Sequence, residues 1–89
     1  MNIIFDESFE KSIKKVYDKA LSAKLPLVIK QVEQTKKLSD IIQLKKLQGF
    51  KSYYRIRLGN YRLGIELVLD NTELFIIVAH RKDIYNKFP

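Results

Sequence analysis

The chain contains no cysteine, which excludes disulfide bonds, thiolate metal sites and cysteine nucleophiles. It has a single histidine, His80, so a histidine-built metal site is not expected. No cofactor is expected either. No apolar run approaches the roughly 20 residues of a membrane-spanning helix, and no contact with a membrane is expected. Residues 1–7 lack the basic start of a signal peptide, which makes the cytoplasm the expected location.

The length and composition are those of a small folded domain. The 89 residues are 46% hydrophobic and 30% charged, which argues against disorder. A chain of this length has room for one modest hydrophobic core, so we expect one domain over residues 1–89.

Positive charge is the most informative property of the composition. Seventeen Lys and Arg residues against ten Asp and Glu residues give a net charge of +7, which favours an anionic partner such as nucleic acid. The two cations are segregated along the chain. Eleven of the thirteen lysines lie in positions 1–51, and all four arginines lie between positions 55 and 81. The planar guanidinium group is well suited to binding phosphate.

The first half of the chain has the apolar periodicity of helices. Residues 3–5 predict a short first strand, and Asp6 or Ser8 is suited to cap the helix after it. A stripe with helical spacing predicts one helix to about residue 21, built on Phe9, Ile13, Val16, Tyr17, Ala20 and Leu21. Pro26 suits the first turn of a second helix. Residues 39–48 are compatible with another helical turn or with a loop.

The second half is typical of strands. Residues 53–58, 61–69 and 74–79 are rich in aromatic and branched side chains, and residues 83–88 predict a short helix or an extended cap. A helical hairpin followed by a strand meander predicts an α+β fold.

A two-residue loop at Gly59 and Asn60 fixes the register of the first hairpin, because Leu58 then faces Tyr61. One face becomes wholly apolar or aromatic and should pack on the helices. On the other face Arg57 lies opposite Arg62. Like charges in that position cost about 0.2–1 kcal/mol, so the pair suggests that an anion binds between them. Screening by solvent and Glu66 is the alternative explanation.

The third strand extends this cluster if the loop around residues 71–72 has an even length. Arg62 then faces Arg81, and Gly64 faces Ala79. The two small residues leave space for a ligand, although Gly64 is also compatible with a bulge. A loop of odd length would turn Arg81 to the other face. Three convergent arginines form a donor array suited to binding a phosphodiester and stabilising charge that develops on it.

Three segments together resemble the RelE/ParE superfamily of type II toxin–antitoxin toxins, and the RelE branch most. They are Leu44–Gly49, the Y-x-I-R-x-G-x-Y-R-L block at 54–63, and the H-R-x-x-x-Y block at 80–85. The resemblance implies a microbial-RNase-like fold, with an N-terminal strand and a helical hairpin packed on a mostly antiparallel, four-stranded twisted sheet.

The resemblance also implies an activity and partners. RelE-like toxins cut mRNA in the ribosomal A site, where the 2′-OH attacks the adjacent phosphate. A cognate RelB-like antitoxin wraps and inactivates the toxin, and the complex contacts operator DNA only through the antitoxin.

By the same resemblance, Arg57, Arg62, Arg81, His80 and Tyr85 are the expected catalytic residues. The residues expected to bind RNA are Arg55, Lys51, Tyr53 and Lys82. Arginine cannot readily give up a proton, so the general base stays open between His80 and Glu66. Tyr85 is expected to stack on a base or to orient the 2′-OH. Strand alternation turns His80 toward the helices, and Tyr53 and Tyr85 are equally compatible with packing roles.

Two other functions fit the same resemblance. One is a non-catalytic, ParE-like inhibitor of DNA gyrase, although such chains usually have a longer helical hairpin and lack this basic set. The other is an inactive copy that only binds its antitoxin.

Overall fold

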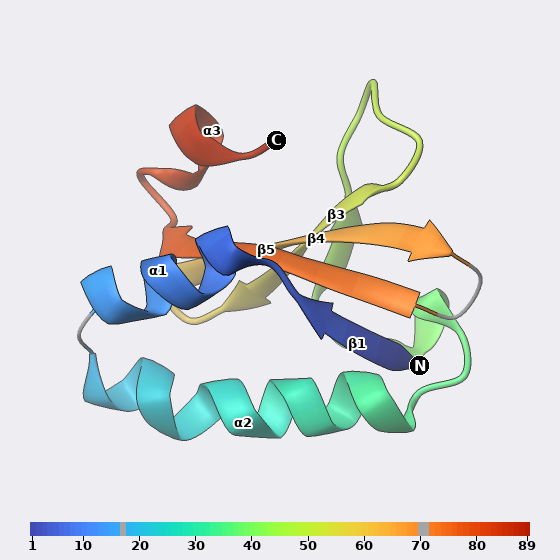
Figure 1. The fold of residues 1–89 in the computed structure, drawn as a ribbon, viewed down its shortest axis with the longest axis horizontal. Helices are drawn as coiled ribbons and strands as arrows, with labels where there is room; N and C mark the ends of the chain where they lie inside the picture. The colour runs from blue at the N-terminus through green and yellow to red at the C-terminus, as the bar shows by residue number, and fades with distance from the viewer. Residues whose placement is uncertain (17, 70–71) are drawn as a thin grey trace.

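The computed structural model describes residues 1–16, 18–69 and 72–89 (Figure 1). The chain is α+β, as predicted. Its elements in chain order are β1 (Asn2–Phe5), α1 (Glu7–Lys15), α2 (Lys19–Gln34), a 3₁₀ turn η1 (Leu38–Asp40), β2 (Leu44–Lys46), β3 (Tyr53–Leu58), β4 (Tyr61–Leu69), β5 (Thr72–His80) and α3 (Ile84–Lys87). None of the described helices is long and apolar enough to cross a membrane.

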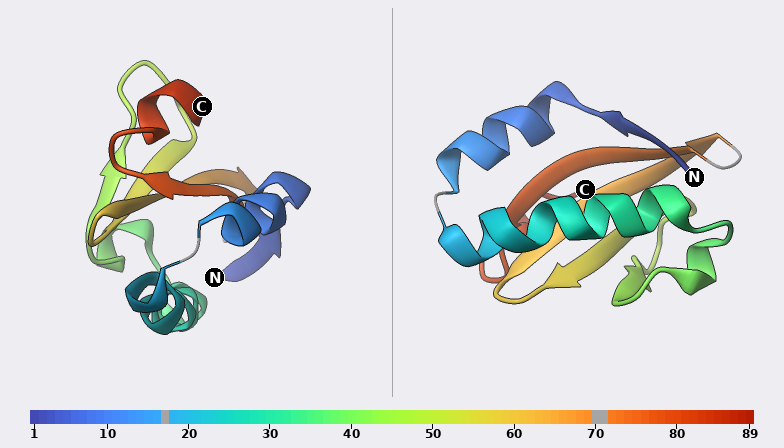
Figure 2. Two further views of the ribbon diagram at one scale, coloured as in Figure 1. Left: turned by 90° about the vertical axis from the view of Figure 1, so that its left-hand side faces the viewer. Right: turned by 90° about the horizontal axis from the view of Figure 1, so that it is seen from below.

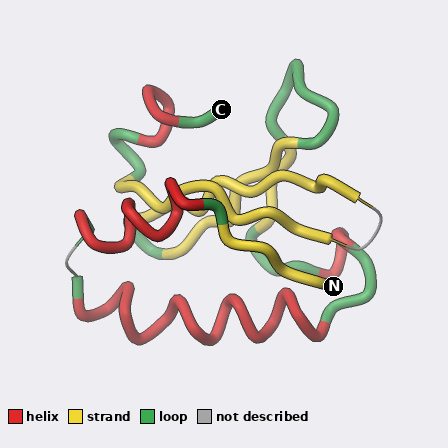
Figure 3. The backbone as a smooth tube through the Cα atoms, viewed as in Figure 1, coloured by secondary structure: helices red, strands yellow, loops and turns green. Residues whose placement is uncertain are grey.

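The strands, drawn in yellow in Figure 3, belong to one sheet. It has five strands in the order β1-β5-β4-β3-β2, rather than the four expected. The sheet is mostly antiparallel, as predicted, and β1 alone pairs in parallel, along β5. The additional strand is β2. It lies in residues 39–48, for which the sequence is compatible with either a helical turn or a loop. Its three residues pair with β3 and place Lys45 opposite Arg55.

The helical hairpin forms, but its break lies earlier than the apolar stripe predicts. Asp6 caps α1, and its side chain accepts a hydrogen bond from the Ser8 amide. α1 ends at Lys15, and Asp18 then caps α2 by accepting a hydrogen bond from the Leu21 amide. This second cap favours a new helix where the stripe predicts a continuous one. Tyr17 lies outside the described residues.

The expected helix boundary at Pro26 is therefore wrong, because Pro26 lies inside α2. Proline removes the helical partner of the Ser22 carbonyl, but both residues are exposed, so water can solvate that carbonyl. The expected stripe also needs correction at Ile13, which is 39% exposed. Ser12 is the buried residue on that turn of α1.

The two faces of the sheet differ in their cover. α2 runs along one face and α3 sits over the other, as the two turned views show (Figure 2). Between α1, α2 and the sheet lies the main core, formed by Phe9, Leu21, Leu25, Val32, Ile41, Ile56, Leu58, Leu63, Ile65, Phe75 and Val78. A smaller cluster of Ala79, Ile84 and Phe88 fixes α3 on the opposite face.

The predicted register of the β3–β4 hairpin is confirmed along its whole length. Leu58 pairs with Tyr61, and Arg57 lies directly opposite Arg62. Gly59 adopts φ +61, whereas Asn60 keeps a negative φ, as in a type II′ turn.

The predicted register of β4 and β5 is wrong, by two residues at positions 61–64 of β4 and by three at positions 65–67. Arg62 faces Ala79 instead of Arg81, and Gly64 faces Ile77. Two register shifts, between Gly64 and Ile65 and between Leu67 and Leu69, change the pairing along β4. The expected turn falls partly on residues 70 and 71, outside the described residues. Because the error is an even number at the end of the pairing next to Arg81, this residue keeps the parity of the arginine face, although it lies one residue beyond the end of β5.

The small residues Gly64 and Ala79 do not leave room for a ligand, contrary to expectation. Phe88 packs directly on the Gly64 backbone, where an added Cβ would lie 2.7 Å from the Phe88 ring. Ala79 is buried against Ile84 and Phe88. The space between these small residues is thus filled by the C-terminal segment of the chain itself.

Candidate RNA-binding and catalytic site

The site is a hollow on the open face of the sheet, and we call it the arginine hollow. Its volume is ≈ 410 Å³, and its lining comes from β2, β3, β4 and α3. The lining residues are Gln43, Leu44, Lys45, Arg55, Arg57, Arg62 and Tyr85. Strand alternation explains why the cations gather there, because residues 55 and 57 and their cross-strand neighbours share one face.

Arg62 is the best-supported guanidinium of the group. Its Nη1 donates to the carbonyl oxygens of Gly59, at 2.9 Å, and Tyr61, at 2.8 Å. The pKa of Arg62 is lowered by burial and then by the charges of Arg57, Arg81 and Arg55. The other three arginines therefore repel the charge of Arg62, and an anion among them would relieve this repulsion.

Arg57 and Arg81 complete the cluster from its edges, and both are exposed. The Arg81 amide donates to the Asn60 carbonyl at 2.8 Å, which ties the residues after β5 to the β3–β4 turn. Arg81 does not line the hollow, but its charge reaches Arg62.

Tyr85 reaches the hollow from α3, and the residue is 74% exposed. The Arg55 Cζ lies 4.8 Å from the centre of the Tyr85 ring, a cation–π arrangement. The pKa of the Tyr85 phenol is lowered, first by hydrogen bonding with Arg55 and then by the charge of Arg55, with smaller effects of Lys45 and Arg62. The arrangement both orients the ring and makes its proton easier to transfer.

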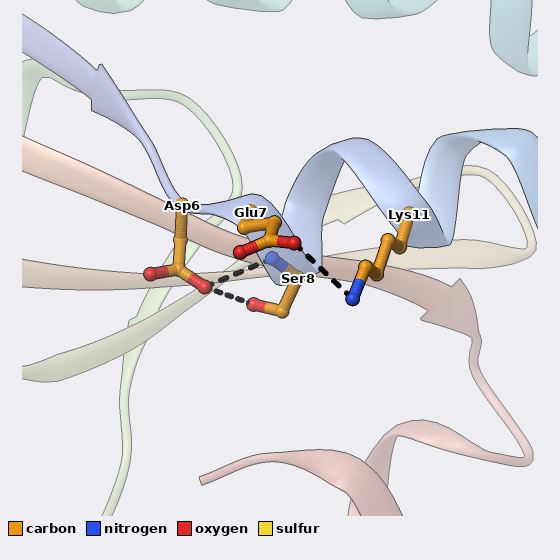
Figure 4. A network of polar contacts seen from close by, with 4 residues as sticks. All are labelled: Asp6, Glu7, Ser8 and Lys11. Carbon is orange, nitrogen blue, oxygen red and sulfur yellow. Dashed lines mark hydrogen bonds and ion pairs between the residues drawn. The ribbon is translucent and has the colours of Figure 1, made fainter.

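No carboxylate neutralises this cluster among the described residues. The one ion pair within them joins Lys11 and Glu7 on α1, at 3.3 Å (Figure 4). Glu66 shares the face but lies opposite Tyr53, and its Oε2 accepts a hydrogen bond from the Ser52 hydroxyl at 3.4 Å. A group of unneutralised guanidinium ions around an open hollow is suited to bind a polyanion.

His80 is not brought together with the arginines. Its backbone pairs with that of Tyr61, and its side chain lies on the face of the sheet opposite the arginines. The His80 and Tyr61 rings meet edge to face, with 5.5 Å between their centroids. The strand alternation that turns Arg81 toward the arginine face turns His80 away from it. His80 lines a different hollow, between α1 and the end of β5.

The expected RNA-binding residues divide in the same way. Arg55 lines the hollow, whereas Lys51 and Lys82 are exposed outside its lining. The Tyr53 ring packs edge-on against both Phe50 and Phe88, at 5.5 and 5.4 Å. Its position is that of a packing residue beneath the C-terminal segment.

Sequence reasoning did not find Lys45 and Gln43. Both belong to the segment whose structure was left open, so their place beside β3 could not be read from periodicity. Gln43 adopts φ +66, and its carbonyl accepts from the Arg57 amide at 3.1 Å. The available signal was the segment Leu44–Gly49, which contributes to the family resemblance and contains Lys45.

Comparisons with known proteins give a consistent answer. No family model matches the chain. Toxin RelE3 of Methanocaldococcus jannaschii is 40% identical over 90 residues, which cover 100% of both chains. A chain of the RelB–RelE antitoxin–toxin complex from Methanococcus jannaschii superposes with a TM-score of 0.80 at 37% identity, covering 97% of this chain and 99% of that one.

A more distant structure shares the fold. A chain of the archaeal RelE–RelB complex from Pyrococcus horikoshii superposes with a TM-score of 0.69 at 19% identity, over 90% of this chain and 93% of that chain. The 40% identity to the Methanocaldococcus toxin extends over both full chains, so it supports membership of the same family and not only a shared fold. The chain belongs to the RelE family of toxins.

Proposed function

We propose that this chain is the toxin of a type II toxin–antitoxin module and cuts mRNA on the ribosome. The observation that carries the proposal is the arginine hollow, in which Arg55, Arg57 and Arg62 converge with no carboxylate partner among the described residues. A single-stranded polyanion is the ligand for which such a surface is suited.

In the proposed reaction, the 2′-oxygen of one nucleotide attacks the adjacent phosphorus as the bond from phosphorus to the 5′-oxygen breaks. The products are a 2′,3′-cyclic phosphate and a 5′-hydroxyl. One proton leaves the 2′-OH and one is delivered to the departing 5′-oxygen. Negative charge grows on the non-bridging oxygens, and Arg57, Arg62 and Arg81 stabilise it there.

We assign to Tyr85, as phenolate, the acceptance of the proton from the 2′-OH, and solvent delivers the proton to the departing 5′-oxygen. The arginines retain their protons throughout the accessible pH range. The Arg55 guanidinium lowers the pKa of the Tyr85 phenol, and a pKa closer to the working pH favours transfer. His80 lies outside the hollow and receives no part in this step.

A RelB-like antitoxin is the proposed protein partner, and operator DNA is contacted only through it. The structure that superposes with a TM-score of 0.80 is a RelE chain bound to RelB. The prediction is that the product of a neighbouring small gene co-purifies with the chain and neutralises it, and that the chain alone does not retard operator DNA in a gel.

The function is tested by inducing the chain and mapping mRNA ends by primer extension, with purified programmed ribosomes as the second assay. We expect codon-phased cuts with cyclic phosphate ends. Arg62→Ala and Arg57→Ala should each lower the cleavage rate about 10²- to 10³-fold, as removal of one transition-state donor does elsewhere. Lys30→Ala, on the exposed face of α2, is the matched cation control and should cleave normally.

Three outcomes would contradict the proposal. Full cleavage by the arginine variants would show that the site is elsewhere. DNA breaks without mRNA cuts would indicate gyrase as the target. Antitoxin binding without growth arrest or cleavage would indicate an inactive copy.

A further inference from the structure

We propose that a second hollow binds one nucleotide of the RNA, outside the cleavage site. It is the largest of the hollows described for this chain, at ≈ 530 Å³, and lies between α1, the end of β5 and α3. We call it the lysine groove and define it by Lys11, Lys15, His80, Tyr61, Asp83 and Lys87. The inference rests on the proposed function for the identity of its ligand, because RNA is the polymer that the arginine hollow would hold.

The walls of the groove are basic and come from two elements. Lys11 and Lys15 are four residues apart on α1, so they lie on one face of that helix. Lys87 approaches from α3, and Asp83 is the one acidic residue of the lining. Lys11 is already paired with Glu7, which leaves Lys15 and Lys87 as the cations for a phosphate (Figure 4).

The floor is lined mainly by apolar residues. Residues 77–79 of β5 and Val16 supply it. The Ser12 hydroxyl on this floor is already used, because it donates to the Phe9 carbonyl at 2.7 Å and accepts from the Val78 amide at 3.0 Å. A flat base can cover such a floor without leaving a buried polar group unpaired.

His80 gives the groove a defined hydrogen-bond donor beside this floor. Its Nδ1 accepts from the Lys82 amide at 3.2 Å. In the neutral ring the proton must then lie on Nε2, which becomes the donor. Tyr61 holds the ring edge-on, so the imidazole can meet a base by its face or its Nε2–H.

The groove and the arginine hollow are neighbours across α3. Ile84 and Phe88 anchor this short helix on the sheet, Tyr85 belongs to the arginine hollow, and Asp83 and Lys87 belong to the groove. Arg81 follows His80 directly in the chain. A strand of RNA that passes over the end of β5 can therefore meet both sites.

His80 makes the test specific, because it is the one histidine in the sequence and gives a single set of imidazole NMR signals. Adenosine 5′-monophosphate is titrated into the chain while these signals are followed. We expect a saturable shift that is abolished in the Lys15→Glu, Lys87→Glu double variant. The matched control is Lys30→Glu with Lys36→Glu, an equal charge change at exposed positions away from the groove, and it should retain the shift.

Salt dependence gives a second readout. Binding of a nine-residue oligoadenylate is measured with a variant of the arginine hollow, Arg57→Ala with Arg62→Ala. The lysine double variant in that background should lower the slope of log K against log salt by about 0.7 for each phosphate that the chain no longer binds. An unchanged slope would overturn the proposal.

Other ligands separate the alternatives. Inorganic phosphate alone and adenosine alone are titrated in the same way. If phosphate reproduces the shift, adenosine does not shift the His80 signals, and adenosine 5′-monophosphate binds no more tightly than phosphate, the groove is an anion site and the nucleotide proposal is wrong. Equal binding of an oligoglutamate peptide would overturn it as well. Because the titration needs no cleavage, a chain that binds at His80 but cuts no mRNA refutes the proposed function and leaves the groove intact.

Discussion

The two faces of the sheet hold unpaired charge under opposite conditions. On the open face, Arg55, Arg57 and Arg62 lie side by side without a carboxylate among the described residues, and they reach water. On the covered face, Glu73 is 0% exposed, and neither of its carboxylate oxygens has a hydrogen-bond partner among the described residues. Burial raises the pKa of Glu73 to about 7, against a smaller opposing effect of the Met1 ammonium. The arginines thus keep their charges close together because water solvates them, whereas burial shifts the Glu73 carboxyl toward its neutral form.

The largest expected effect on stability is at Glu73, through pH. Its carboxyl has an ordinary pKa of 4.5 and a folded pKa of about 7. Between these values the unfolded chain releases the proton and the folded chain keeps it, so stability falls as pH rises and reaches a constant loss of about 3 kcal/mol above pH 7. Glu73→Met should therefore be more stable than the parent chain in urea denaturation at pH 7.5, with the gain shrinking toward pH 4.

Glu10→Met, at an exposed position on α1, is the control for that experiment and should keep the parent pH dependence. If Glu73→Met shows the same pH dependence as the parent chain, the covered face does not hold an unpaired acid, and the comparison between the faces fails.

The next effect concerns the contact that joins the sheet to α3. A methyl group at Gly64 would lie 2.7 Å from the Phe88 ring, so Gly64→Ala should cost about 1–3 kcal/mol, the range for overpacking. The measurement is a double-mutant cycle by urea denaturation. In a Phe88→Ala background the added methyl should cost little. An equal cost in both backgrounds would place the strain elsewhere.

A smaller loss is expected where α1 is fixed to β5. The Ser12 hydroxyl bridges the Phe9 carbonyl and the Val78 amide. Ser12→Ala should lower the free energy of unfolding by about 0.5–1.5 kcal/mol, the usual net contribution of a hydrogen bond. Ser22→Ala, on the exposed side of α2, should change it little. Equal effects of the two substitutions would mean that this bridge does not stabilise the covered face.

The smallest effect has the opposite sign and tests the open face. Arg57 lies directly opposite Arg62, and like charges in that position destabilise a strand pair by about 0.2–1 kcal/mol. Arg57→Thr should therefore raise the free energy of unfolding by that amount while it lowers mRNA cleavage. Added salt should reduce the gain, because it screens the repulsion. A loss of stability would show that the arginine pair does not carry a cost.

The sequence predicted those parts of the molecule that local chemistry controls. A two-residue turn fixes register, so the Arg57–Arg62 pair could be read directly. The Asp6 cap and the α+β class follow from equally local patterns. The β4–β5 register could not be read, because two irregularities in pairing leave no mark in the hydrophobic alternation.

Long-range contacts account for the remaining errors. The position of β2, and with it Lys45, depends on pairing across residues 47–52. The packing of Phe88 on Gly64 joins residues 24 positions apart, so a glycine that seemed to make room for a ligand instead accommodates the chain's own aromatic ring.

The two carbonyl oxygens that accept hydrogen bonds from Arg62 affect how fast a ligand can bind to this side chain and leave it. Gly59 and Tyr61 supply partial negative charge that does not titrate, so the support of Arg62 is the same at every pH at which the chain is folded. Both carbonyls accept from Nη1, so the Nη2 and Nε donors of the guanidinium stay available. Among the described residues, a phosphate that arrives has no carboxylate to displace from Arg62, and a product that leaves is not replaced by one.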